Sequence, residues 1–150
     1  MKKSIDDLKA YMNSRLQENH FVHHLGMELG NLNEGFAEVW LNVEERHLQH
    51  TGFLHGGVTA SLLDVSTGIA AYTQAPEGKN VVTAELKISY LNPSVGARVK
   101  AIGRVRKAGN TLLFCEGELY DVQPDGEDRL VATATSLMIA VDIPLKSQQS

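Results

Sequence analysis

His55, Gly56 and Gly57 directly precede a run of apolar and small residues that contains a single charge, Asp64. Burying a carboxylate costs several kcal/mol unless a partner or a proton neutralises it. The first N–H groups of a helix have no acceptor within the helix and carry a partial positive charge, and glycines there let a ligand oxygen come close. These residue types predict an oxyanion-binding helix N-terminus and an acid that acts as a base or nucleophile.

The spacing between the two groups limits how they can work together. Asp64 lies eight residues after Gly56, which is about 12 Å along a helix. A base and an oxyanion donor must lie close to one reacting group, so Asp64 of one subunit would have to face Gly56 of another, most simply in a two-fold dimer. Two alternatives remain open. The glycines only form a tight turn into the helix, or Asp64 is a structural acid bonded to a hydroxyl such as that of Thr67.

Hydrophobic periodicity indicates the elements that must position these residues. Apolar residues at helical spacing predict an amphipathic helix over 4–18, and the run after Gly57 predicts a buried helix over 58–72. Alternating residues predict strands over 25–32, 35–43, 81–91, 97–107, 111–122 and 130–141. The turns between the last four strands are too short for a crossover helix, which predicts antiparallel neighbours. The expected fold is one α+β domain over residues 1–150, a long antiparallel sheet wrapped around one helix.

Composition excludes several classes of protein. A formal net charge of −4 argues against a nucleic-acid binder. One cysteine, Cys115, excludes an intrachain disulfide and fits a reducing cytoplasm, where we expect the protein. No signal-like segment and no apolar run of about 18 residues is present, so we expect neither secretion nor a membrane span.

Other chemistries are weakly supported. Cys115 has no partner histidine in sequence, and Ser61 and Ser66 do not lie in a GxSxG elbow, which argues against cysteine and serine hydrolases. The histidines cluster without the cysteine or carboxylate pattern of a zinc site, so we expect no metal. One cluster is His20, His23 and His24, and the other is His47 and His50. We expect His23 and His24 at a strand entry.

The segment HLQHTGFLHGGVTASLLDVSTGIAA resembles the hotdog-fold acyl-CoA thioesterases of the phenylacetate-pathway, PaaI-like group. The similarity extends through EGFAEVWLNVEERHLQ, VVTAELKISYLNPSVG and RKAGNTLLF and covers about residues 20–141. It implies a hotdog fold, an acyl-CoA substrate and homodimers that often pair into tetramers. It implies no metal or bound cofactor.

The resemblance also implies roles for individual residues. Asp64 would be the general base or nucleophile, and the Gly56 N–H would bind the thioester carbonyl, with His55 shaping the pocket. Gln49 would place water or substrate. Thr83 would assist on the side of Asp64.

The same resemblance implies a binding surface for coenzyme A. The matching positions are Gly57, Tyr90, Asn92, Pro93, Ser94, Lys107, Gly109, Asn110 and Thr111. A local basic strip suits phosphates, although a solvated strand face is the alternative. The strip consists of Arg98, Lys100, Arg104, Arg106 and Lys107.

Two other functions on the same fold remain as alternatives. A hydroxyacyl-thioester dehydratase would need a histidine and a carboxylate facing each other in one tunnel. A non-catalytic acyl-CoA binding module would tolerate loss of Asp64. The acyl group is an aromatic ring or a medium aliphatic chain, and the candidates to line its apolar tunnel are Phe53, Leu63, Ile69 and Tyr72.

Overall fold

The computed structural model describes residues 4–142 of the chain. The N-terminal part holds two helices and the first two strands, α1 (Ile5–Glu18), α2 (His20–Leu25), β1 (Glu28–Asn33) and β2 (Phe36–Asn42). A short 3₁₀ turn, η1 (Glu45–His47), and a loop lead to the long helix α3 (Gly56–Gln74). Four strands follow, β3 (Asn80–Tyr90), β4 (Arg98–Ala108), β5 (Leu112–Asp121) and β6 (Arg129–Val141).

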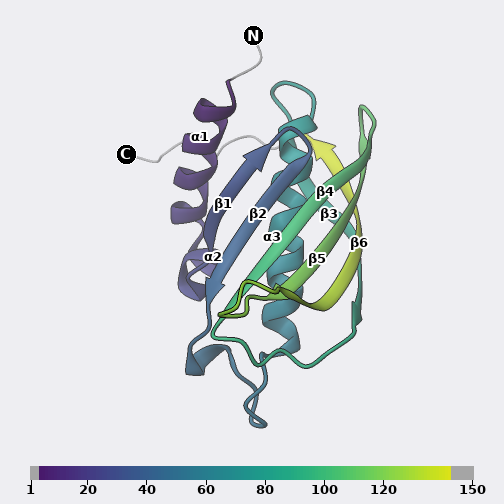
Figure 1. Cartoon of the computed structure of the whole chain (residues 1–150). Coiled ribbons are helices and arrows are strands. Elements are labelled where there is room, and N and C mark those ends of the chain that lie inside the picture. The colour runs from purple at the N-terminus through teal and green to yellow at the C-terminus, as the bar shows by residue number, and fades with distance from the viewer. Residues whose placement is uncertain (1–3, 143–150) are drawn as a thin grey trace.

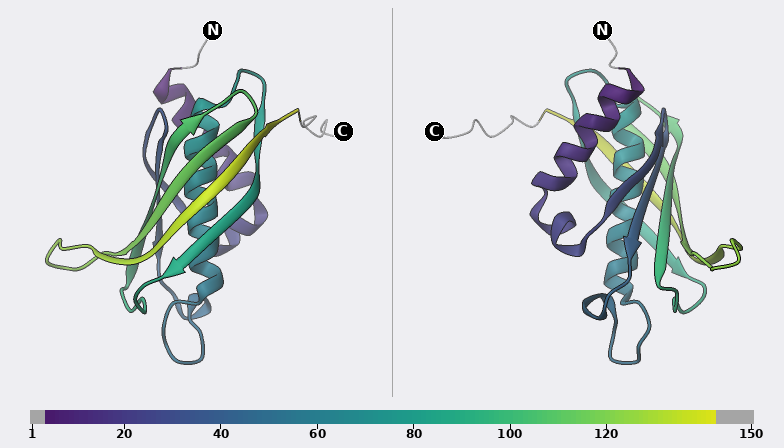
Figure 2. Two further views of the ribbon diagram at one scale, coloured as in Figure 1. Left: turned by 90° about the vertical axis from the view of Figure 1, so that its right-hand side faces the viewer. Right: turned by 60° about the vertical axis from the view of Figure 1, so that its left-hand side comes forward.

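The six strands form one antiparallel sheet in the order β1-β2-β4-β5-β6-β3. The sheet curves around α3, which runs along its concave face (Figure 1; Figure 2, left). Helix α1 lies beside β1 and α2, at the edge of the sheet opposite β3 (Figure 2, right). The α+β hotdog architecture expected from the sequence is therefore confirmed.

Two glycines on the sheet allow α3 to approach it closely. A Cβ atom on Gly103 of β4 would lie 2.3 Å from the Ser66 carbonyl oxygen, and one on Gly117 of β5 would lie 3.0 Å from the Leu63 side chain. Leu63 is completely buried on this face. The opposite face is only half-buried in the single chain, at Asp64 and Gly68 among others. The prediction of a helix buried on every side was therefore wrong for one face, and that face carries the acid.

Helix α2 replaces the beginning of the strand that was predicted from residue 25. The Asn19 side chain accepts a hydrogen bond from the Val22 N–H at 3.2 Å and begins the helix. Gly26, with φ 81°, ends it in the left-handed conformation that glycine adopts without strain. His23 and His24, expected at a strand entry, lie in the last turn of α2.

The position of β3 also differs from the prediction. The strands pair antiparallel as expected, but β3 pairs with β6 and not with β4. Strand β2 occupies the place beside β4, in register from Phe36↔Arg104 to Asn42↔Arg98. Residues 91–97 therefore connect two strands that are not neighbours, and β3 becomes an edge strand. Within residues 4–142, no helix is long and apolar enough to cross a membrane.

Candidate active site

The N-terminus of α3 presents one free backbone donor. His55 precedes the first turn, and its Nδ1 atom accepts a hydrogen bond from the Gly57 N–H at 2.9 Å. The Val58 and Thr59 N–H groups donate to the His55 carbonyl oxygen at 2.9 and 3.2 Å. Among the hydrogen bonds of the described residues, the Gly56 N–H has no acceptor. The predicted oxyanion donor is thus available to a ligand.

A pocket of about 290 Å³ surrounds this end of the helix. The Tyr90 hydroxyl reaches it from β3 and donates to the Gly56 carbonyl oxygen at 2.8 Å. The Gln49 N–H donates to the Phe53 carbonyl oxygen at 2.8 Å, which closes the loop before the helix. The structure gathers six predicted site residues around this pocket, namely Gln49, Gly56, Tyr90, Asn92, Pro93 and Ser94.

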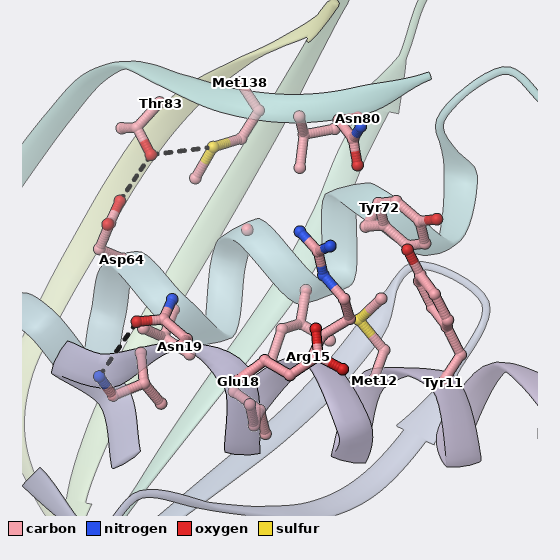
Figure 3. Close-up of a pocket in the computed structure, with 16 residues that line it drawn as sticks. Tyr11, Met12, Arg15, Glu18, Asn19, Asp64, Tyr72, Asn80, Thr83 and Met138 are labelled. Atoms are coloured by element: carbon pink, nitrogen blue, oxygen red, sulfur yellow. Dashed lines mark hydrogen bonds between the residues drawn. The ribbon is translucent and has the colours of Figure 1, made fainter. Parts of the chain in front are cut away.

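Asp64 lies farther along α3, half-buried, with a hydroxyl donor from the edge strand. The Thr83 Oγ1 atom donates to Asp64 Oδ1 at 2.6 Å and also lies 3.4 Å from the Met138 sulfur (Figure 3). The Thr67 hydroxyl bonds instead to the backbone carbonyl oxygens of Leu63 and Asp64, at 2.8 and 3.2 Å. The carboxylate therefore has Thr83 as its partner, and the alternative of a bond to Thr67 was wrong.

Asp64 and Thr83 border a second pocket of about 440 Å³ between α1, α3 and the start of β3 (Figure 3). Its walls include Met12, Leu16, Val65 and Ile69. Away from Asp64, the rings of Tyr11 and Tyr72 stack with their centroids 5.9 Å apart. Of the expected tunnel residues, Ile69 and Tyr72 line this pocket. Leu63 is completely buried against the sheet, so the prediction was wrong for this residue. Phe53 lines the pocket at Gly56, and its place in an acyl tunnel stays a prediction.

Within one chain, the two groups that could do chemistry border different pockets. Gly56 and Gln49 line the pocket at the beginning of α3, whereas Asp64 and Thr83 line the pocket on its flank. Eight residues of continuous helix separate Gly56 from Asp64, or about 12 Å. Within a single chain, Gly56 and Asp64 thus do not border a common pocket.

The expected coenzyme A positions are divided in the same way. Tyr90 and residues 92–94 lie near the beginning of α3, whereas Lys107, Gly109, Asn110 and Thr111 lie in or beside the hairpin between β4 and β5. Strand β4, of which Lys107 is the last residue but one, runs from one group to the other, and its 11 residues span roughly 36 Å. The Thr111 carbonyl oxygen accepts from the Ala140 N–H at 2.8 Å, and Ala140 pairs with Val81. The hairpin therefore lies at the same end of the sheet as the Asp64 pocket.

Most of the basic strip is neutralised by acidic residues. Arg104 and Arg106 on β4 pair with Glu118 and Glu116 on β5, at 2.9 and 2.6 Å. The other pair joins Lys100 to Asp128 at 2.5 Å, while the Arg98 guanidinium lies 4.0 Å from the centroid of the Trp40 ring. These pairs favour the alternative of a solvated strand face for the three paired residues, and phosphate binding by the strip stays a prediction. Lys107 is exposed and has no ion pair within the described part of the chain.

A buried acid that the sequence analysis did not single out holds the connection after β3. Asp121 is completely buried and accepts hydrogen bonds from the Ser94 hydroxyl and from the Val95 N–H at 3.1 Å. Arg129 bonds both to Asp121, at 3.0 Å, and to the Pro93 carbonyl oxygen, at 2.5 Å. The Ser94 hydroxyl is thus engaged inside the protein.

His47 has a structural environment. It is completely buried, its Nδ1 atom accepts from the Glu44 N–H at 2.9 Å, and its Nε2 atom lies 2.8 Å from the Leu25 carbonyl oxygen. These partners assign the proton to Nε2 and connect η1 to α2. Among residues 4–142, no group of three potential metal ligands is gathered.

Comparison with known proteins places this architecture in a family. The family model described as thioesterase superfamily matches residues 51–127. A thioesterase family protein from Silicibacter pomeroyi has a TM-score of 0.84 and 29% identity, over 92% of this chain and 98% of that one. The Escherichia coli PaaI protein from the phenylacetic acid degradation operon has a TM-score of 0.76 and 26% identity, over 92% and 96% of the two chains. A curated relative, the medium/long-chain acyl-CoA thioesterase YigI of Salmonella typhimurium, is 28% identical over 86% of this chain and 94% of its own.

The chain belongs to the thioesterase superfamily. The resemblance to PaaI-like hotdog thioesterases and the expectation of a thioester hydrolase are both confirmed.

The pocket at Asp64 also contains polar residues that the sequence analysis missed. Tyr11 and Arg15 from α1, Asn19 directly after it and Asn80 from the start of β3 all line it. The available signal was that Tyr11 and Arg15 lie four residues apart and therefore share one face of the predicted helix. Nothing in the sequence indicated that this face would lie over α3.

Proposed function

We propose that the protein hydrolyses acyl-CoA thioesters, with an aryl or medium-chain acyl group, at a site shared by two copies of the chain. The observation that carries this proposal is the division of the site. A free Gly56 N–H and a hydroxyl-bonded Asp64 lie on one helix but border different pockets.

The thioester carbonyl oxygen would bind at the Gly56 N–H. A donor at this position stabilises the negative charge that develops on the oxygen as the carbonyl is attacked, an effect of about 3 kcal/mol in other hydrolases. The partial positive charge of the helix N-terminus acts in the same direction. His55 supports this role by engaging the neighbouring Gly57 N–H, which leaves Gly56 as the donor. Gln49, on the rim of the same pocket, would hold water or substrate.

Asp64 of the facing subunit would bring about the attack on the thioester carbonyl carbon in one of two ways. As a general base it takes a proton from water, and the hydroxide adds to the carbonyl. As a nucleophile it forms an anhydride, which water then hydrolyses. In both cases the carbon–sulfur bond breaks, coenzyme A leaves as a thiolate that takes up a proton, and the acid is released. The Thr83 hydroxyl holds Asp64 Oδ1 in position.

The edge strand β3 offers the contact that would join two subunits. It has an unpaired edge, and Val82 and Tyr90 are 39% and 56% exposed. Exposed strand edges readily pair with another chain. Around a two-fold axis, such pairing is antiparallel and places the start of one β3, with Thr83 and Asp64, beside the end of the other, with Tyr90 and Gly56.

The same dimer would reunite the two parts of the coenzyme A surface. The hairpin at 107–111 lies at the Asp64 end of the sheet, and residues 90–94 lie at the Gly56 end. Joining opposite ends therefore brings Lys107 of one subunit toward Tyr90 of the other. We expect two such dimers to pair into a tetramer. The single buried cysteine fits the reducing cytoplasm where we expect the enzyme.

The test is thiol release from a panel of acyl-CoAs by the wild type and by Asp64→Asn. The panel spans phenylacetyl, hydroxylated aryl and short to long aliphatic thioesters. We expect turnover by the wild type and a loss of roughly 10²–10⁴-fold in kcat for the variant, the range typical of a lost general base. Asp125→Asn, which changes an exposed acid between β5 and β6, is the matched control and should leave turnover unchanged.

Each other outcome excludes a defined part of the proposal. Full activity in Asp64→Asn, with the oligomer intact, would exclude the role of Asp64. Binding of acyl-CoA without turnover by the wild type would make the protein a binding module. Release of water from a hydroxyacyl-CoA, with the thioester intact, would indicate the dehydratase alternative.

A further inference from the structure

Arg15 places a positive charge in the pocket that begins at Asp64. Its guanidinium points from α1 into the space below β3, between Asn19 and Tyr72 (Figure 3). Arg15 is exposed to solvent in the single chain, and it differs from Lys100, Arg104 and Arg106, which are paired with acids. Within residues 4–142, Arg15 has no carboxylate at ion-pair distance and no side-chain hydrogen bond. A guanidinium in a concave site without a partner can bind an anionic ligand group through two parallel hydrogen bonds.

Polar groups around Arg15 could complete such a site. The Asn80 amide and the Tyr72 hydroxyl line the same pocket. Burial, together with a hydrogen bond to Tyr11, raises the pKa of Tyr72 to about 12, so its hydroxyl remains protonated at neutral pH. A carboxylate near Arg15 would thus find a cation and neutral donors within the pocket.

Apolar walls separate this polar region from Asp64. Asp64, Gly68 and Tyr72 lie at intervals of four along α3 and therefore on one face of the helix. Gly68 leaves space between the two ends, and Met12 and Ile69 line the pocket beside it. The helical distance from Asp64 to Tyr72 is about 12 Å, which an extended alkyl chain with bonds of ~1.5 Å spans in roughly eight to ten carbon atoms.

We propose that Arg15 is a specificity-determining residue that binds a carboxylate at the far end of the acyl group, so that the preferred substrates are medium-chain ω-carboxyacyl-CoAs. This inference rests on the proposed thioesterase function and narrows its substrate class. The thioester lies at Asp64, the methylene chain follows Gly68 and Ile69, and the terminal carboxylate meets Arg15.

Two acidic residues border the pocket, and neither forms an ion pair with Arg15. Glu18 Oε1 accepts a hydrogen bond from the Ser14 hydroxyl at 3.0 Å, at the exposed surface of α1. Asp64 Oδ1 accepts from Thr83. Because Asp64 belongs to the reacting end, a substrate carboxylate at the opposite end avoids its charge and gains that of Arg15.

The experiment compares matched thioesters of equal chain length, octanoyl-CoA with suberoyl-CoA and decanoyl-CoA with sebacoyl-CoA. We expect the wild type to prefer the ω-carboxy member of each pair in kcat/KM. Arg15→Gln should lower kcat/KM for the ω-carboxy substrates by roughly 10–100-fold, the value of a hydrogen bond to a charged group, and change that for the neutral ones less than threefold. Arg15→Lys should retain part of the preference, because it keeps the charge without the planar fork.

Lys9→Gln is the matched control, since it removes a positive charge from the same helix outside the pocket. An equal effect of Lys9→Gln would attribute the preference to net charge and overturn the role of Arg15. Equal losses on neutral and ω-carboxy substrates in Arg15→Gln would overturn it too, as would a wild-type preference for the neutral member. Turnover of the neutral substrates distinguishes a failure of this inference from a failure of the proposed function. Turnover of octanoyl-CoA without an ω-carboxy preference contradicts only this inference, whereas no turnover of any thioester also contradicts the proposed function.

Discussion

His55 determines which of the two glycine N–H groups can bind a ligand. Its Nδ1 atom accepts from Gly57, so the ring holds the turn into α3 and leaves the Gly56 N–H free. In the proposed mechanism, a histidine with this bond would act by positioning the donor, without touching the reacting carbonyl. At the residue scale, the free donor at Gly56 therefore depends on its neighbour in sequence.

Cys115 gives a residue-scale prediction for stability at high pH. Burial raises the pKa of its thiol from 9.0 to about 11. Because the unfolded thiol ionises first, this contribution to stability is complete below pH 9 and is lost as the pH rises from about 9 to about 11. We expect the free energy of unfolding of the wild type to fall by about 2 kcal/mol more than that of Cys115→Ala between pH 7.5 and pH 10.5. Urea unfolding at the two pH values measures the difference.

Tyr72 and Tyr120 also affect stability at high pH, and they do so in both the wild type and the variant. Burial is the main cause that raises the pKa of Tyr72 to about 12, and a hydrogen bond with Glu118 is the main cause for Tyr120, also to about 12. Both lower stability at alkaline pH equally in the wild type and the variant, so the difference isolates the thiol. Parallel curves for the two proteins would contradict the prediction.

The candidate site residues could be recognised in the sequence only where they stood out from their surroundings. Asp64 did so as the one charge in an apolar run, and Gly56 as a glycine before a helix. Arg15 did not, because a basic residue on an amphipathic helix ordinarily faces solvent. Its place in the pocket results from the packing of α1 over α3, which no local pattern encodes.

At the element scale, the connection between β3 and β4 depends on one buried acid. Asp121 binds the Ser94 hydroxyl, the Val95 N–H and Arg129, and thereby fixes residues 93–95. We expect Asp121→Asn to lower the free energy of unfolding by about 1–3 kcal/mol, since it removes a charged acceptor from a buried network. We also expect a higher KM for acyl-CoA, because this connection borders the pocket at Gly56.

A shorter thioester distinguishes the two effects of Asp121→Asn. The KM for an N-acetylcysteamine thioester, which lacks the nucleotide, should change little in a variant whose defect lies in the coenzyme A surface. Asp125→Asn, at an exposed acid in the connection that follows Asp121, should change neither stability nor KM appreciably. An unchanged unfolding midpoint for Asp121→Asn would show that the network does not hold the connection.

The elements themselves were predictable to different degrees. Alternation located β2, β4, β5 and β6, because each buries one face against α3. It also located β3, although this edge strand is only partly buried in the single chain. Helix α2 was missed because its six residues, HFVHHL, are too few to show a period. The order of strands in the sheet could not be predicted from local sequence patterns, because the pairing of β3 with β6 joins segments about 50 residues apart in sequence. The ion pairs of the basic strip depend on the register of β4 against β5 and were missed for the same reason.

At the scale of the whole molecule, the fold places the proposed catalytic groups and the expected coenzyme A positions at two ends. The free N–H and residues 90–94 lie at one end, whereas Asp64 and the hairpin after β4 lie toward the other. The exposed edge of β3 connects these ends along its length. Pairing of two β3 strands around a two-fold axis would therefore complete two sites at once, and a single chain would complete none.

This arrangement predicts that two inactive variants restore activity when they form a hybrid dimer. Asp64→Asn removes the acid. Gly56→Pro removes the N–H. We expect the helix to tolerate proline, because proline fits the first helical position. The preceding residue, His55, already has the extended backbone that proline requires, with φ −63° and ψ 134°. In a hybrid of the two, one site combines both defects and the other combines the intact Asp64 of one chain with the intact Gly56 of its partner. Purified through two different tags, the hybrid should show about half the wild-type kcat per dimer, because one of two equivalent sites is intact.

Gly56→Ala is the control, because alanine keeps the N–H and its Cβ would meet the Tyr90 ring at an ordinary 3.4 Å. We expect it to retain most of the wild-type activity, which assigns the loss in Gly56→Pro to the missing donor. A hybrid as inactive as its two parents, with the dimer intact by light scattering, would mean that Asp64 and Gly56 act within one chain. Since α3 holds these residues eight positions apart, that result would require the helix to rearrange, and the two-subunit site would be excluded.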